Sequence, residues 1–216
     1  MNIHFHKNDL PDHVSFVKKD FKGAIAIDTE AMGLRTERDR LCLVQLSAGD
    51  GDCHLVQIPK VAGSLGGSKI HTAPNLKTVF ENQNIIKIFH YGRFDIAAIK
   101  HYLGITVTPV FCTKIASKLV RTYTDRHGLK DLCKSFLNVE LSKEEQTSDW
   151  GAERLSQDQL KYAAQDVLYL HTLKEKLEAL LVREGRMEIA QKCFEFLPTL
   201  AEMDHLGYTG ETILCH

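Results

Sequence analysis

The sequence predicts an α/β protein in which a mixed sheet of about five strands is flanked by helices. Short apolar runs typical of buried strands occur at 24–30, 41–46, 53–58, 85–89 and 106–110. Short polar links join the first three runs, which favours antiparallel pairing. The last two alternate with segments of helical periodicity, as expected of parallel strands covered by helices.

The helices are predicted from apolar spacing and capping residues. Asp12 is a candidate N-cap for a short helix, and Ser156 with Gln159 three residues later forms a capping box. Residues 1–6 alternate weakly, which leaves a short sixth edge strand open, and 59–74 is a surface loop with a Gly/Ser-rich insert at 63–68. The predicted helices are 10–21, 75–81, 93–103, 112–120, 128–137, one long helix from 156 past 181, and 187–197.

The bulk composition is that of an ordinary globular protein. The chain has 216 residues, 44 % of them hydrophobic, which is enough to bury a core. We expect one catalytic domain over 1–216, with a C-terminal extension at about 204–216. The formal net charge is −1, without the basic excess of proteins that wrap long nucleic acid. Any nucleic-acid contact is therefore local, or the substrate is short.

The cysteines and apolar runs predict a location in the cell. The six cysteines are scattered and none form a pair with metal-ligand spacing. Such cysteines suit a reducing compartment, and the sequence shows neither a secretory signal nor a run long enough to span a membrane. We expect a cytoplasmic protein without a membrane partner.

The strand at 24–30 carries the first chemical signal, because it runs directly into Asp28 and Glu30. Alternate side chains of a strand share a face, so the two carboxylates lie side by side. They repel each other and resist desolvation, and a divalent cation relieves both effects. For an Asp-x-Glu alone, a solvated strand end is the favoured explanation.

Two further carboxylates strengthen the signal. Asp95 follows the strand at 85–89 and lies in the first turn of a predicted helix. Taken alone, its favoured role there is that of a dipole partner or cap. Asp166 lies one helical turn from Tyr162 on the same face. The small residues Ala163 and Ala164 between them allow close approach, and a buried aspartate on an inward face needs a cation or a strong donor.

In order and spacing, the three motifs resemble those of the DEDD 3′-5′ exonucleases, tyrosine subclass, and specifically the ribonuclease D family. The chain is most similar to its compact nano-RNase C group, which lacks appended RNA-binding domains. The stretches that carry the resemblance are Asp28-Thr29-Glu30, His90-Tyr91-Gly92-Arg93-Phe94-Asp95, Tyr162-x-x-x-Asp166, and the segments 39–42, 111–117, 121–130 and 145–150.

This resemblance implies an RNase H-like fold and two divalent metal ions, Mg²⁺ or Mn²⁺, that act on short RNA, including dinucleotides. By the family's pattern, Asp28 bridges both ions, while Glu30 and Asp166 complete the site of the attacking water. Asp95 supports the second ion through water, and Tyr162 orients the attacking water. Carboxylate oxygens are the ligands that such hard cations prefer.

A second set of residues is expected to bind the substrate. Leu34 either wedges against a terminal base or is itself a core residue. Trp150 either stacks on a base or, as we favour, packs under the Tyr162 helix. Candidate phosphate contacts are Arg93, Arg121, Arg126 and His127, although for any single one of them a surface or ion-pair role is favoured. The predicted substrate-binding residues are Thr29, Gly33, Leu34, His90, Tyr91, Arg93 and Trp150.

Other functions remain open at this point. A DNA exonuclease of repair or proofreading type would use the same motifs, because sugar selection has no sequence signature. A catalytically silent module would not need all four carboxylates, and a small-molecule phosphohydrolase would not need room for a second nucleotide. The apolar residues of 204–216 further predict a homo-oligomer larger than a dimer, with this tail near a subunit interface.

Overall fold

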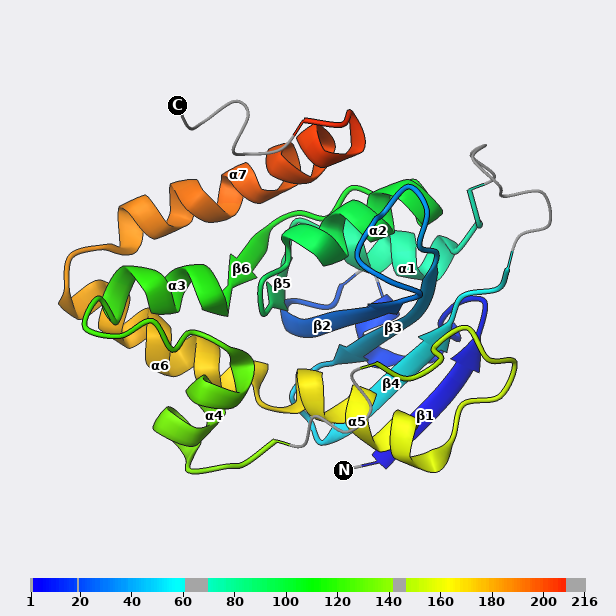
Figure 1. The fold of residues 1–216 in the computed structure, drawn as a ribbon, viewed down its shortest axis with the longest axis horizontal. Coiled ribbons are helices and arrows are strands. Elements are labelled where there is room, and N and C mark those ends of the chain that lie inside the picture. Colours follow the sequence, from blue (N-terminus) through cyan, green and yellow to red (C-terminus); the bar gives the residue numbers. More distant parts are fainter. Residues whose placement is uncertain (1, 19, 61–69, 142–146, 209–216) are drawn as a thin grey trace.

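The fold is a six-stranded mixed sheet with helices packed against it (Figure 1). The structure, a computed structural model, describes residues 2–18, 20–60, 70–141 and 147–208. The strands are β1 (Asn2–Lys7), β2 (Gly23–Ala31), β3 (Leu41–Ser47), β4 (Asp52–Gln57), β5 (Ile85–Phe89) and β6 (Val110–Cys112). The helices are the 3₁₀ turn η1 (Ser15–Val17), α1 (Pro74–Glu81), α2 (Arg93–Leu103), α3 (Thr113–Val120), α4 (Leu129–Leu137), α5 (Gln157–Leu168), α6 (Leu170–Arg183) and α7 (Met187–His205).

The strand order is β1-β4-β3-β2-β5-β6. As predicted, β2, β3 and β4 form an antiparallel meander, and β5 and β6 extend it with parallel pairs. The prediction of about five strands is one short, because residues 2–7 form β1, which pairs in parallel with β4. The α/β fold class predicted from the sequence is confirmed.

The strand predicted at 106–110 is wrong, since β6 begins at Val110. Pro109 has no N–H to donate to a strand ladder, which delays the start of the strand. Instead, the Thr108 amide donates to the Phe80 carbonyl at the end of α1, 3.2 Å away.

The helix predicted at 10–21 is also wrong, because only the short turn η1 forms there. Asp12 caps no helix and accepts a hydrogen bond from the Asn75 side chain at 2.7 Å. Its neighbour Asp9 caps α1 instead, since its carboxylate accepts from the backbone amides of Asn75 and Leu76 at 2.8 and 2.9 Å. These acidic residues stabilise a helix distant in sequence rather than a local one.

The C-terminal helices differ from the prediction in where they end. The capping box is confirmed: the Ser156 hydroxyl accepts from the Gln159 amide, and the Gln159 side chain accepts from the Ser156 amide. The predicted long helix, however, breaks at Tyr169 into α5 and α6. In contrast, α7 continues beyond the predicted end at 197 and through Pro198, because its packing on α2 offsets the lost hydrogen bond (Figure 1).

The Gly/Ser-rich insert at 63–68 and most of the tail predicted at 204–216 lie outside the described residues. Within the described part of the chain, none of the helices has the length and apolar character needed to cross a bilayer.

Candidate active site

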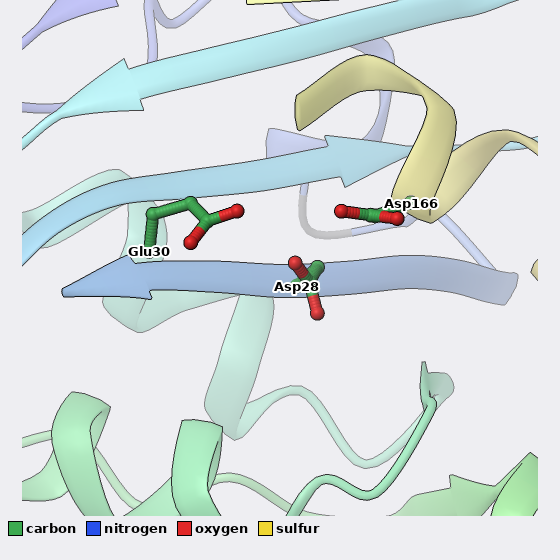
Figure 2. Close-up of side chains that lie close together, drawn as sticks. All are labelled: Asp28, Glu30 and Asp166. Atoms are coloured by element: carbon green, nitrogen blue, oxygen red, sulfur yellow. The ribbon is translucent and has the colours of Figure 1, made fainter. Parts of the chain in front are cut away.

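Three carboxylates converge where α5 crosses β2. One oxygen each from Asp28, Glu30 and Asp166 can be chosen so that all lie within 4.8 Å of one another. Figure 2 shows Asp28 and Glu30 rising from the strand and Asp166 facing them from the helix. Ala163 and Ala164 are fully buried, so α5 packs against the sheet with small side chains at the contact. This brings together residues that are 136 to 138 positions apart in the chain (166 − 30 and 166 − 28).

Asp95 joins the cluster from α2. Its side chain is buried and its Oδ1 accepts a hydrogen bond from the Thr29 hydroxyl at 2.6 Å. Thr29 lies between the two carboxylates of β2 and points to the opposite face of the strand. The Asp95 side chain is therefore held by the neighbouring strand, and it is more than a dipole partner for its own helix.

The crowding of these carboxylates changes their protonation. Burial, together with the negative charges of Asp95, Asp166 and Glu30, raises the pKa of Asp28 well above its usual range. Burial first, then Asp166 and Asp95, raises the pKa of Glu30 to about 9. The pKa values of Asp95 and Asp166 are both raised to about 7, mainly by burial. Such a cluster binds protons at neutral pH unless cations replace them.

Tyr162 lies one turn before Asp166 on α5 and is partly buried. Burial, followed by the charge of Asp166, raises the pKa of its hydroxyl, so the phenol stays protonated at neutral pH. Trp150 is 2 % exposed, and its ring centroid lies 6.0 Å from that of Tyr162. It therefore packs beneath this helix, as favoured from the sequence.

A cavity of about 1000 Å³ opens beside the cluster. Leu34 exposes 86 % of its surface there, so its alternative role as a core residue is wrong. Packing explains the glycine at position 33, because a Cβ there would collide with the Asp39 carboxylate. The predicted residues that line the cavity are Asp28, Thr29, Glu30, Gly33, Leu34, His90, Tyr91, Arg93, Asp95 and Trp150.

Several lining residues were missed by sequence reasoning. Asp204, Gly207 and Tyr208 at the end of α7 form part of the wall, although we expected this segment at a subunit interface. The Arg93 guanidinium makes two hydrogen bonds to the Asp204 carboxylate, at 2.6 and 2.5 Å, across 111 positions. No local pattern could reveal this pair. It ties the end of α7 to the start of α2, and Arg93 is thus engaged in an ion pair.

Gln45 is a further missed residue. It lies on β3 directly opposite Asp28 in the strand register and is fully buried. Its amide nitrogen is 3.5 Å from an Asp28 oxygen, the outer limit of a hydrogen bond. A single glutamine within an apolar run, as in Leu43-Val44-Gln45-Leu46, was the available signal.

Three basic candidates for phosphate contact are not among the residues that line the cavity. Arg121 is buried and donates to the Arg126 carbonyl at 2.8 Å. His127 is also buried and lies 2.9 Å from the Ser117 hydroxyl through its Nδ1. Arg121 and His127 therefore stabilise the segment after α3, and Arg126 is exposed beside them.

Comparison with known proteins agrees with this geometry. A family model described as 3′-5′ exonuclease matches residues 5–182, which is most of the chain. The chain belongs to this family. Ribonuclease D of Gluconacetobacter diazotrophicus is 33 % identical over 164 residues, which cover 76 % of this chain and 39 % of that protein. The chain thus spans about two fifths of the length of the ribonuclease D relatives it matches.

Two solved structures match over almost their whole length. Brucella melitensis NrnC with bound Mg²⁺ is 53 % identical with a TM-score of 0.84, and the match covers 96 % of this chain and 95 % of that one. The same protein bound to pGG is 52 % identical with a TM-score of 0.88, covering 100 % and 99 %. The exonuclease is therefore an NrnC-like member of the DEDD ribonuclease D family, as predicted from its motifs.

Proposed function

We propose that this NrnC-like exonuclease hydrolyses short RNA from the 3′ end, down to dinucleotides, and releases nucleoside 5′-monophosphates. The carboxylate cluster beside the cavity of about 1000 Å³ carries this proposal. That volume is at the upper end of ordinary ligand pockets, roughly 300–1,000 Å³, and suits a short oligonucleotide. The net charge of −1 and the pGG-bound relative support the same substrate class.

The proposed cofactors are two divalent ions, Mg²⁺ or Mn²⁺. The donor set fits them, because it consists of crowded carboxylates with raised pKa values and offers only oxygen. Asp28, Glu30 and Asp166 would hold one ion, and Asp28 with Asp95 would hold the second. When bound, the ions would activate water and neutralise charge on the phosphate. The Mg²⁺-bound relative supports this assignment.

The residues of the chain would then orient the attacking water and the substrate. Attack of water oxygen on phosphorus breaks the bond to the 3′ oxygen, which leaves with a proton, while the terminal nucleotide keeps its 5′-phosphate. Tyr162 would hold the attacking water through its hydroxyl, whose raised pKa makes it unsuited to act as a base. Leu34 lies exposed in the cavity, where it can wedge between neighbouring bases.

We expect Tyr162→Phe to slow turnover by about tenfold to a hundredfold. The substitution removes one hydroxyl that orients water and leaves all four carboxylates in place. Mg²⁺ binding, measured by calorimetry, should remain close to that of the wild type. Turnover at the wild-type rate would show that Tyr162 serves only as a packing partner of Trp150.

A time course on 5′-labelled RNA of two to about ten nucleotides tests the function. Stepwise loss from the 3′ end in Mg²⁺, abolished by EDTA, is the expected result. Matched DNA oligonucleotides separate a ribonuclease from a DNA exonuclease. Hydrolysis of mononucleotides alone would instead indicate a phosphohydrolase, and inactivity without metal binding would indicate a silent module.

We also propose that residues 1–216 form one catalytic domain that assembles into a homo-oligomer larger than a dimer. Ile189 and Phe196 lie seven residues apart on one face of α7 and expose 54 % and 38 % of their surfaces. Exposed apolar side chains on one face of a helix suit a contact between copies.

Light scattering behind size exclusion should give a mass above twice 24.4 kDa. Ile189→Asp should lower that mass, because it places a charge in the proposed contact. Phe5→Asp makes the same change at an exposed apolar side chain on β1, the sheet edge opposite β6 and α7. It is the matched control and should leave the mass unchanged. A monomeric wild type at micromolar concentration would refute the assembly. An oligomer that survives deletion of 207–216 would show that the tail does not cause it.

A further inference from the structure

His90 lies one residue beyond the end of β5 and lines the cavity. β5 runs beside β2 in the sheet (Figure 1), and Ala26 pairs with Ile88 in this parallel register. β2 continues to Asp28, and the chain leaves β5 at His90, so both residues follow this pair by two positions and both line the cavity. Adjacent strands are about 4.8 Å apart, so the imidazole lies close to where the scissile phosphate would bind.

The hydrogen bonds of His90 determine which ring nitrogen carries the proton. Nδ1 lies 2.9 Å from the hydroxyl of Thr113, which is fully buried. The hydroxyl has one hydrogen and also lies 3.2 Å from the Phe89 carbonyl, so both contacts are hydrogen bonds only if that hydrogen goes to the carbonyl. Thr113 can therefore only accept from His90, so Nδ1 carries the hydrogen and Nε2 is left with a lone pair.

The ring is also neutral. Burial, with a smaller contribution from the nearby Lys114 ammonium, lowers the pKa of His90 to about 3. The Lys114 ammonium itself lies over the Tyr91 ring, 4.0 Å from its centroid. At neutral pH the imidazole thus offers one acceptor and no positive charge.

Nε2 is free to use this lone pair on a ligand. Among the described residues Nε2 has no hydrogen-bond partner. Nor is the atom fully buried, because it is absent from the buried polar atoms that lack a partner. Nε2 thus keeps accessible surface and a lone pair, on a residue that lines the cavity where substrate would bind.

The chemistry of the substrate limits what this acceptor can bind. Phosphodiester oxygens carry no hydrogen at neutral pH, so a neutral acceptor gains nothing from them. The donors next to a phosphate are the hydroxyls of the attached sugar, and the 2′-hydroxyl is present only in RNA. We propose that Nε2 of His90 accepts a hydrogen bond from a ribose hydroxyl of the 3′-terminal nucleotide and thereby selects the sugar. This inference rests on the proposed function.

Two conservative substitutions test the contributions of the two ring nitrogens separately. In His90→Asn, the side-chain NH₂ replaces Nδ1–H and can still donate to Thr113, but the acceptor at Nε2 is lost. In His90→Gln, the longer amide oxygen reaches the position of Nε2 and keeps the acceptor. Thermal unfolding of both variants shows whether the fold is retained.

The test compares kcat/KM for an RNA dinucleotide with its 2′-deoxy and 3′-deoxy analogues, altered only at the 3′-terminal nucleotide. The wild type should prefer the RNA dinucleotide over one analogue by about three- to tenfold, the range of one hydrogen bond. His90→Asn should lose that factor on the RNA dinucleotide and hydrolyse the sensitive analogue as the wild type does. His90→Gln should retain most of the preference.

Other outcomes would overturn the inference. If His90→Asn lowers kcat/KM equally for all three substrates, or for none, the residue does not read the sugar. If the wild type hydrolyses all three at one rate, the proposed function stands and the role of His90 fails. If the wild type hydrolyses none of them in Mg²⁺, the proposed function fails and this inference fails with it.

Discussion

Asp28→Asn is expected to lower hydrolysis by about 10³-fold or more, measured as single-turnover release of nucleotide from a labelled dinucleotide. The residue lies in the carboxylate cluster and is the proposed ligand of both ions, so its loss removes charge where the phosphate must be neutralised. Asp125→Asn, the same change at an exposed turn, is the matched control and should retain full activity.

The same variant should unfold at a higher temperature than the wild type when both are in EDTA. Its carboxylate is surrounded by three others that raise its pKa, and an uncharged amide of similar shape removes that repulsion. Higher stability with lost activity is typical of a site arranged for a ligand. A folded Asp28→Asn protein with wild-type activity would refute the mechanism.

The second large effect is a pH-dependent stabilisation by Mg²⁺. The pKa of Glu30 is raised to about 9 and those of Asp95 and Asp166 to about 7, so the folded protein holds protons that the unfolded chain has released. Without metal, these groups stabilise the fold most at low pH, and this contribution is lost as pH rises through the folded pKa values. Metal binding replaces the protons, so the stabilisation by Mg²⁺ should grow from pH 5 to pH 9.

The expected gain is about 1.4 kcal/mol per pH unit for each proton that binding releases. Lys87 and His54 have lowered pKa values of about 7 and about 4, and their contributions rise with pH. They act with and without metal, so the quantity to measure is the difference in unfolding free energy between Mg²⁺ and EDTA. Asp28→Asn should flatten this difference. A Mg²⁺ effect that is constant across this range would contradict the proposed site.

The sequence determined the features whose causes are local. The alternation of a strand places Asp28 and Glu30 on one face, and helical spacing places Tyr162 one turn from Asp166. The helix at 93–103 was predicted with its observed bounds, because its apolar period and the glycine after it act within a few residues. These local rules, combined with the resemblance of the motifs, were sufficient to predict the family and the carboxylates of the site.

Only the tertiary structure decided contacts between distant segments. The Thr29–Asp95 hydrogen bond joins residues 66 positions apart, and the Arg93–Asp204 pair joins residues 111 apart. The end of α7 likewise lines the cavity beside residues from the first strands. The pairing of β1 and the break at Tyr169 likewise depend on what packs against those residues. Their free energy comes from burial and hydrogen bonding between segments, which no periodicity within one segment encodes.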